Sequence, residues 1–304
     1  MNLKKDFIKQ VEEIVGIQNV RKMEPMGKYT TFKVGGPADL LVYPSDYKKI
    51  MEIIKLCVDN EIDYFVMGNG SNLIVRDGGF RGVIINLTHL DAIKVEDKVI
   101  TAQCGALLSR VSRTALSSSL KGLEFAAGIP GSIGGAIAMN AGAYGGEMSM
   151  VVESALLIDD HGQMIELSNK QLELSYRNSA VLRNNYIVLE TKIRLERGIQ
   201  DEIKAMMDDF AERRRSKQPL EYPSAGSTFK RPEGYFAGKL IQDAGLKGKC
   251  VGDAQVSEKH SGFIINKGSA SAKNILDLIK VVQETVHNMF GVELKTEVRI
   301  IGED

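Results

Sequence analysis

Apolar residues recur along the chain with two periods, one typical of one-sided helices and one typical of strands. The stretch 45–58, SDYKKIMEIIKLCV, places its apolar side chains on one side of a helix and offers Ser45 as the N-cap. Short apolar runs at 39–43 and 64–67 flank it and predict strands. The pattern therefore predicts a β-α-β unit that ends at GNGSNL, residues 68–73.

The same periods predict an α+β region that continues to about residue 195, followed by a region of different composition. An amphipathic helix is expected at 201–220, then a turn-rich stretch at 223–234, a long helix at 271–290 ended by Gly291, and one or two strands at 292–303. Before this change, strands are expected at 81–87, 98–103, 153–159 and 187–195, and one helix at 106–118. We place a domain boundary near residue 200.

Composition and charge exclude several classes of protein. The chain has 304 residues with 39 basic and 39 acidic side chains, so no net field recruits nucleic acid or an anionic membrane. Apolar runs are much shorter than a membrane span, and the first 16 residues lack the apolar core of a signal peptide. A cytoplasmic protein without membrane insertion is therefore expected.

Cysteine and histidine spacing gives no sign of a metal site or a disulfide framework. Cys57, Cys104 and Cys250 are far apart and form no CxxC pair, and the four histidines lack ligand spacing. The three cysteines are expected to be small core residues, and no metal is predicted.

Residues 128–147, GIPGSIGGAIAMNAGAYGGE, contain seven glycines in twenty positions. Tight turns between strands would explain part of this composition. A ligand cradle is the second interpretation, because Pro130 stiffens the entry and Ser132 stands where it could cap a short helix. Exposed amides at such an N-terminus bind anions, above all phosphates.

Arg213-Arg214-Arg215, at the end of the helix predicted at 201–220, also has two interpretations. The triplet could meet a nucleotide phosphate. A solvated helix C-terminus is favoured, because cations there complement the helix dipole.

Common nucleotide and hydrolase motifs are missing from the sequence. Gly68-Asn-Gly70 begins like a Rossmann fingerprint but has Leu73 where the third glycine belongs, and there is no phosphate loop, nucleophile elbow or HExxH helix. What remains is two glycine-rich loops with donor side chains at Ser71, Asn72 and Ser132. Together they suit a diphosphate better than a single phosphate.

Six motifs in register resemble the UDP-N-acetylenolpyruvoylglucosamine reductase family, bacterial flavoenzymes that make UDP-N-acetylmuramate for peptidoglycan. They are GNGSNL, GIPGSIGGAIAMNAGAYGGE, SYRNS, PSAGSTFKRP, FAGKLIQDAGLKG and EVRIIGE, and the resemblance runs from about Thr30 to Glu303. Nine residues, Asn178 to Tyr186, separate Arg177 from the strand expected at Ile187, too few for the extra tyrosine loop of the longer form. The chain therefore resembles the shorter form.

The resemblance implies an α+β fold with a two-part FAD-binding domain of the vanillyl-alcohol-oxidase (PCMH) type and a smaller α+β substrate-binding domain. The expected organisation is an N-terminal helical segment, 1–30, a FAD-binding domain, 31–197, with lobes at 31–87 and 88–197, and a substrate-binding domain, 203–304, whose last strand carries Glu297.

The implied activity is NADPH-dependent reduction of UDP-N-acetylglucosamine enolpyruvate through FAD, in cell-wall synthesis and hence in cell shape and division. Neither glycine cluster contains His or Cys, the usual points of covalent flavin attachment, so dissociable FAD is expected. The expected FAD contacts are Gly68, Asn69, Gly70, Ser71, Asn72, Pro130, Gly131, Ser132 and Gly134.

By the same resemblance, Arg177 and Glu297 stabilise charge on the substrate and Ser227 donates a proton to C2. Hydride arrival at C3 leaves an enolate-like carbanion, so cationic and hydrogen-bonding partners are needed there. Lys217, Lys239, Gln242 and Asn266 are expected to bind the UDP portion or the substrate carboxylate. The protein is expected to be a monomer or a weak oligomer.

Two other functions stay open at this point. A flavoprotein of the same fold that works as an oxidase or hydroxy-acid dehydrogenase would react with oxygen or an alcohol donor. A non-catalytic nucleotide-binding module would keep the glycine-rich cradle, but it has no need for Arg177, Ser227 and Glu297 together.

Overall fold

The computed structural model describes residues 3–304, which divide into two compact units that interleave along the chain. Unit 1 contains the described residues up to Arg21 together with Leu40–Asn69 and Gly82–Arg214. Unit 2 contains Lys22–Asp39, Gly70–Arg81 and Arg215–Asp304. The division into 1–30, 31–197 and 203–304 follows sequence order and stays a prediction.

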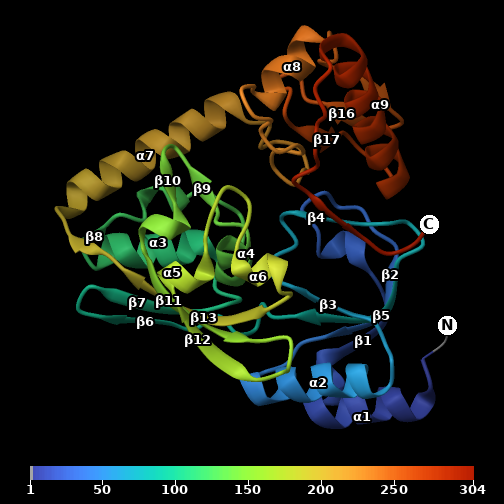
Figure 1. The fold of residues 1–304 in the computed structure, drawn as a ribbon, viewed down its shortest axis with the longest axis vertical. Helices are drawn as coiled ribbons and strands as arrows, with labels where there is room; N and C mark the ends of the chain where they lie inside the picture. Colours follow the sequence, from blue (N-terminus) through green and yellow to red (C-terminus); the bar gives the residue numbers. More distant parts are fainter. Residues whose placement is uncertain (1–2) are drawn as a thin grey trace. The chain divides into compact units, whose positions relative to one another are not determined.

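Residues 5–86 include a four-stranded sheet and two helices, of which α1, α2 and β3 belong wholly to unit 1. The sheet has the order β1-β2-β5-β3, and β3 and β5 are parallel. Helices α1 and α2 pack together beside it (Figure 1). The bounds are β1 Val20–Pro25, β2 Pro37–Val42, β3 Tyr64–Met67, β5 Phe80–Asn86, α1 Lys5–Val15 and α2 Tyr47–Asp59.

The predicted strand, helix and strand around residues 39–67 are confirmed, but the predicted helix cap is wrong by one residue. The N-cap of α2 is Asp46, whose Oδ1 accepts the Lys49 amide at 2.9 Å. Ser45 instead contacts Asp46 and the Lys49 ammonium. A carboxylate is the better cap here because it also interacts with the positive end of the helix dipole.

A five-stranded antiparallel sheet, β12-β11-β13-β7-β6, forms the second part of unit 1. Four helices, α3 to α6, gather on one side of it (Figure 1). The predicted strands at 98–103, 153–159 and 187–195 and the helices at 106–118 and 201–220 are confirmed. The bounds are β6 Ile93–Glu96, β7 Val99–Gln103, β11 Val152–Ile158, β12 Met164–Ser168, β13 Ile187–Arg194, α3 Leu108–Ser117, α4 Ile133–Ala138, α5 Asn169–Leu172, α6 Ala180–Arg183 and α7 Gln200–Lys217. Two-residue strands pair as β8 Leu120–Lys121 with β14 Glu196–Arg197, and β9 Gly142–Ala143 with β10 Gly146–Glu147.

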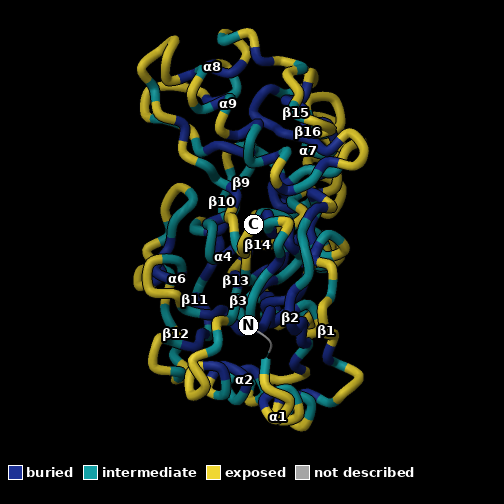
Figure 2. Tube along the Cα trace, turned by 90° about the vertical axis from the view of Figure 1, so that its right-hand side faces the viewer, coloured by how far each residue is buried: buried dark blue, intermediate teal, exposed yellow. Residues whose placement is uncertain are grey.

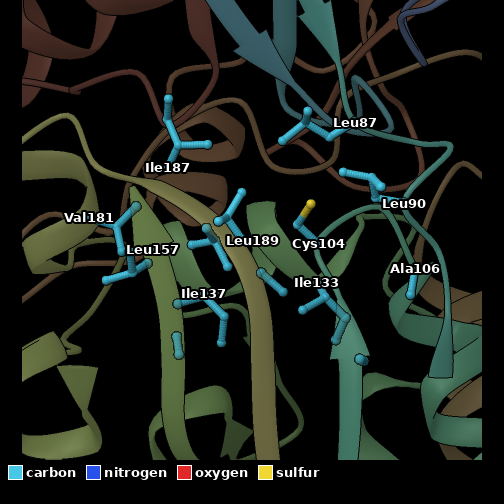
Figure 3. Close-up of a cluster of buried hydrophobic side chains, with 14 of the residues drawn as sticks. Leu87, Leu90, Cys104, Ala106, Ile133, Ile137, Leu157, Val181, Ile187 and Leu189 are labelled. Carbon is cyan, nitrogen blue, oxygen red and sulfur yellow. The ribbon is translucent and has the colours of Figure 1, made fainter. Parts of the chain in front are cut away.

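Helix α4 sits on the core of unit 1 through two isoleucines. Ile133 and Ile137 are four residues apart and therefore share one face of the helix. Both are fully buried, and Figure 3 shows them beside Leu189 of β13 and the Cys104 thiol. The glycine-rich stretch therefore contains a short helix whose apolar side is packed into the core of unit 1.

Unit 2 has its own core, built from strands and helices of the C-terminal region and from two earlier segments. Buried Phe32, Val34 and Ile74 pack with the C-terminal residues (Figure 2 shows β16 among buried segments). Strand β18 pairs in parallel with β4, and β15-β16-β17 form an antiparallel sheet against α9. The bounds are β4 Leu73–Val75, β15 Cys250–Val251, β16 Ala254–Val256, β17 Ile264–Asn266, β18 Arg299–Ile301, α8 Ala237–Asp243 and α9 Ala272–Phe290.

The predicted long helix is confirmed at both ends, with a Ser271 capping box and Gly291 at φ 68°. The cysteine prediction is partly wrong. Cys57 and Cys104 are buried, but Cys250 on β15 is exposed. Among residues 3–304, no helix is both long enough and apolar enough to cross a membrane.

Candidate functional site

The two glycine-rich sequences that lie 60 residues apart in the chain meet in unit 1. Asn69 Nδ2 donates to the Pro130 carbonyl at 2.5 Å. A Cβ atom on Gly68 would lie 2.0 Å from Ser132 Oγ, so a larger residue does not fit there. Gly68 and Asn69 therefore lie against IPGS and form with it a surface of backbone and small polar side chains.

Ser132 stands at the N-cap of α4 as predicted, but its buried side chain makes no capping hydrogen bond, so that part of the prediction is wrong. The first helical amides are also already bonded: Ile133 N donates to Ala106 O at 2.9 Å and Gly134 N donates to Cys104 O at 2.8 Å. A cradle made by those two amides is therefore excluded. Contact between Gly134 and FAD would have to use other atoms than its N–H.

Gly134 and Gly135 have different reasons for being glycine. A Cβ on Gly134 would lie 3.1 Å from Cys104 Cβ, closer than an ordinary van der Waals contact, so packing favours glycine there. Gly135 is exposed, and a Cβ added to it would meet only Ser132 Oγ, at 3.9 Å, among described residues other than its chain neighbours and its own helical backbone. Since glycine in a helix costs about 1 kcal/mol relative to alanine, Gly135 is a candidate for close approach by a ligand. Gly135 is not among the FAD contacts expected from the sequence, although the Gly-Gly pair within a short helix is a usable signal.

The rest of the first glycine cluster lies in unit 2. Gly70 adopts φ 60° and its carbonyl accepts from Thr31 N at 3.2 Å. Ser71 is half-buried. Asn72 Nδ2 donates to the Glu297 carbonyl at 3.1 Å, and the Asn72 carbonyl accepts from Arg299 N at 3.0 Å. The end of GNGSN is thus held against the segment that carries Glu297.

Ser227 and Glu297 lie on neighbouring extended segments of unit 2, where Glu297 pairs with Thr228. Thr228 N donates to Gly262 O at 2.9 Å, and Thr228 O accepts from Glu297 N at 2.8 Å. Antiparallel bridges from Ser227 to Phe263 and from Phe229 to Thr296 continue this pairing. Both residues are half-buried, so neither is sealed in the core of unit 2.

Arg177 belongs to unit 1 and occupies the tip of a tight turn. Ser175 N donates to Asn178 O at 3.0 Å and Asn178 N donates to Ser175 O at 3.1 Å, which closes the turn on both sides. Arg177 has φ 52°, a left-handed conformation, and its guanidinium carbon lies 5.1 Å from the Tyr176 ring centroid. Strand β13 begins at Ile187 as predicted, so the connection after Arg177 is as short as the sequence indicated.

The four predicted substrate residues, all in unit 2, have different surroundings. Lys217 and Gln242 are exposed, and the Lys239 ammonium pairs with Asp243 at 2.7 Å on α8. Asn266 is buried: its Oδ1 accepts from Gly268 N and Ala270 N, and its Nδ2 donates to Phe32 O at 3.1 Å. Asn266 therefore also organises the loop before α9. The substrate contacts of all four residues stay predictions.

The arginine triplet is not uniformly solvated, which corrects the favoured interpretation. Arg213 pairs with Asp209 at 2.9 Å and Arg215 is exposed. Arg214, by contrast, packs on the glycine-rich stretch, since a Cβ on Gly128 would lie 2.5 Å from its Nη1. Burial lowers the pKa of Arg214. A cation beside this stretch is a functional candidate that helix polarity alone did not reveal.

Two family models of known proteins match this chain, each over a different part of it. Residues 38–168 match a family model described as a FAD-binding domain, and residues 218–301 match one described as the C-terminal domain of UDP-N-acetylenolpyruvoylglucosamine reductase. Within residues 3–304, no group of three or more His, Cys, Asp or Glu side chains could hold a metal ion.

Full-length relatives agree with the family models. A UDP-N-acetylenolpyruvoylglucosamine reductase of Clostridium novyi (strain NT) is 58% identical over 98% of this chain and 97% of its own length. The protein of that name from Clostridium tetani is 58% identical over 100% and 99%. The crystal structure of the Thermus caldophilus reductase is 34% identical and covers 91% of this chain and 97% of its own, with a TM-score of 0.80. A glucose dehydrogenase, Phl p 4.0202, shares the fold at 12% identity and a TM-score of 0.52, covering 95% of this chain and 64% of its own.

Fold and matches define a flavoprotein with an α+β FAD-binding domain of the vanillyl-alcohol-oxidase type and a smaller α+β domain after it. Sequence identity of 58% to reductases over nearly the whole chain narrows this class to one family. The chain belongs to the UDP-N-acetylenolpyruvoylglucosamine reductase family.

Proposed function

We propose that this protein catalyses the NADPH-dependent reduction of UDP-N-acetylglucosamine enolpyruvate to UDP-N-acetylmuramate, a cytoplasmic step of peptidoglycan synthesis. Family membership over the whole chain supports the reaction class. The observation that carries the proposal is the backbone pairing of the two segments that bear Ser227 and Glu297, in which Thr228 O accepts from Glu297 N, because adjacent segments then supply a hydroxyl and a carboxyl group.

The chain's glycine-rich surface fits a flavin dinucleotide. Gly68 is glycine because Ser132 occupies the space of a side chain, whereas exposed Gly135 has no such neighbour and leaves its backbone open. The groups proposed to hold FAD are Gly68 to Asn72 and Pro130 to Ser132, together with the backbone at Gly134 and Gly135. When bound there, FAD would accept a hydride from NADPH and deliver it to C3 of the enolpyruvyl ether.

Arg177 is proposed to neutralise the substrate carboxylate as charge develops. Hydride addition at C3 leaves an electron pair at C2 that is delocalised onto this carboxylate, and a fixed cation stabilises that state more than the starting ether. A guanidinium suits the task because its planar N–H groups match a carboxylate.

Ser227 is proposed to donate the proton that completes the product at C2. A hydroxyl is a weak acid, but it suffices for a strongly basic enolate if its proton is replaced afterwards. Glu297 lies on the neighbouring segment and is proposed to stabilise the same charge in its protonated form or through a water. One hydride and one proton thus convert the enol ether to the lactyl ether, and NADPH becomes NADP⁺.

The test is anaerobic NADPH consumption by the purified, FAD-loaded protein with and without UDP-N-acetylglucosamine enolpyruvate. Rapid consumption that depends on substrate, one NADPH for each product, is the expected result. If NADPH or an alcohol reduces the flavin but only oxygen reoxidises it, the protein is an oxidase or dehydrogenase of the same fold. A FAD complex that neither reaction changes would mean a binding module.

A further inference from the structure

The turn that carries Arg177 is strained and needs an anchor. Arg177 has φ 52° and Tyr176 lies before it, the arrangement of turns whose third residue is normally Gly or Asn. Left-handed backbone costs an L-residue with a Cβ roughly 1–2 kcal/mol. Such strain persists only where surrounding structure enforces it, and it concentrates at functional sites.

Ser179, two residues further on, fixes this turn to helix α4. Its side chain is fully buried, and its hydroxyl donates to the carbonyl of Ala138 at 2.7 Å. Ala138 is the last residue of α4, where helix carbonyls lack a partner within the helix. The same oxygen accepts from Leu182 N at 3.2 Å and so caps α6. One hydroxyl therefore ties together the Arg177 turn, α6 and α4.

Helix α4 also carries the glycine-rich surface at its other end. Ser132 is its N-cap, and Gly134 and Gly135 lie in its first turn. Its base is fixed by buried Ile133 and Ile137. A bond from Ser179 to the C-terminus of α4 therefore sets Arg177 relative to the same rigid element that bears the proposed flavin-facing backbone, all within unit 1.

We propose that Ser179 is a positioning residue for the reductase reaction, one that acts through Arg177 by holding the strained turn on α4. This inference rests on the proposed function, because it takes Arg177 to be the group that meets the substrate carboxylate. Loss of the hydroxyl lets the turn relax, so Arg177 moves away from its place without loss of its charge. Displacement of a catalytic group by about 1 Å costs up to roughly 10²-fold in rate.

Rapid-reaction kinetics on Ser179→Ala test this role. Reoxidation of the reduced, FAD-loaded enzyme by UDP-N-acetylglucosamine enolpyruvate should slow by roughly tenfold to 10²-fold. Flavin reduction by NADPH should stay near the wild-type rate. Ser112→Ala is the matched control, because Ser112 is also buried in unit 1 and donates to a backbone carbonyl, that of Leu123, at 2.8 Å. It should leave both half-reactions unchanged.

A double-mutant cycle separates positioning from general support of the fold. In the Arg177→Ala background, Ser179→Ala should have no further effect on reoxidation, because the group it positions is gone. Ser179→Thr keeps the hydroxyl and should restore most of the rate. Equal slowing in both half-reactions, or effects of the two substitutions that multiply, would overturn the proposal.

Failure of the inference and failure of the proposed function give different results. If wild-type enzyme turns over substrate and Ser179→Ala does so equally fast, Ser179 has no positioning role and the function stands. If wild-type reduced enzyme is never reoxidised by the substrate, the proposed function falls and this inference falls with it.

Discussion

Gly135 offers the sharpest residue-scale test of the cofactor surface, because stability and binding should respond to it in opposite directions. Gly135→Ala should stabilise the apoprotein by about 1 kcal/mol, the helix-propensity difference. It should weaken FAD binding, because the new methyl group takes the space that the ligand uses. Apoprotein unfolding and the quenching of FAD fluorescence measure the two effects.

Gly134→Ala is the control, and it should destabilise the apoprotein because its methyl group would press on Cys104 at 3.1 Å. If Gly135→Ala bound FAD as tightly as wild type, the ligand would not approach α4 at this position.

Thiol reactivity should report the different surroundings of the three cysteines. Burial raises the pKa of Cys57 and of Cys104 to about 12, so neither forms the reactive thiolate at neutral pH. Cys250 is exposed. A disulfide reagent should therefore modify one thiol quickly in the native protein and all three after unfolding. Cys250→Ser should remove the fast phase, and a fast phase that remained would show that a core thiol is accessible.

Ser227 can be tested by separating the two halves of the reaction. Ser227→Ala should leave flavin reduction by NADPH nearly intact, because no proton from Ser227 is needed there. Reoxidation by substrate should slow by about 10²–10⁴, the usual contribution of a general acid. Stopped-flow absorbance of the flavin follows each half, and equal losses in both would remove Ser227 from the role of proton donor.

The N-cap of helix α2 should make the stability of the protein depend on pH. The hydrogen bond from the Lys49 amide is the main cause that lowers the Asp46 pKa below its ordinary 3.8. A carboxyl with a lowered pKa contributes stability above its unfolded value, and this is lost as pH falls through the folded value. The contribution of Asp46 should therefore disappear below about pH 4.

Asp46→Asn keeps an acceptor for the Lys49 amide but does not titrate. Its urea midpoint should fall less steeply than that of wild type as the pH drops from about 5 to about 2. Asp46→Ala should be less stable at neutral pH by about 0.5–2 kcal/mol, the cost of a lost cap. Identical pH slopes for wild type and Asp46→Asn would mean that the cap makes no titrating contribution.

Elements whose limits depend on nearby residues could be predicted from the sequence, as α9 shows. Ser271 and Gly291 lie within one turn of its ends, and both act as the pattern indicated. The start of α4 could not be predicted in the same way. Ser132 marks the start of α4 in the sequence, but the first amides of the helix donate to the carbonyls of Ala106 and Cys104. These two residues lie about 30 positions earlier in the chain, so no local pattern predicts the contacts.

The site residues also depend on contacts between distant parts of the chain, which local patterns do not predict. Only family resemblance assigned the two glycine clusters to one cofactor, and Ser227 and Glu297 to one reaction, since no local period connects segments 60 or 70 residues apart. The position of Arg214 against Gly128 and the exposure of Cys250 depend on tertiary packing alone. Neither could be read from the charge pattern or from residue type.

Interleaving of the two units along the chain limits which parts of the protein can fold alone. The core of unit 2 includes Phe32 and Ile74, both fully buried, from segments far before its C-terminal region. Strand β18 also depends on β4 as its pairing partner. The last hundred residues therefore contain most, but not all, of the groups that their own core needs.

A fragment comprising residues 203–304, the predicted substrate-binding domain, should fail to fold cooperatively. It lacks Phe32, Val34 and Ile74 of its core and leaves β18 unpaired. The amide spectrum of this fragment in nuclear magnetic resonance should show little dispersion. In the full chain, Phe32→Ala should lower the stability of unit 2 by about 3–5 kcal/mol, the cost of truncating a buried phenylalanine. A well-dispersed spectrum from the isolated fragment would show instead that the C-terminal residues form a self-sufficient core, and the earlier segments would then only cover it.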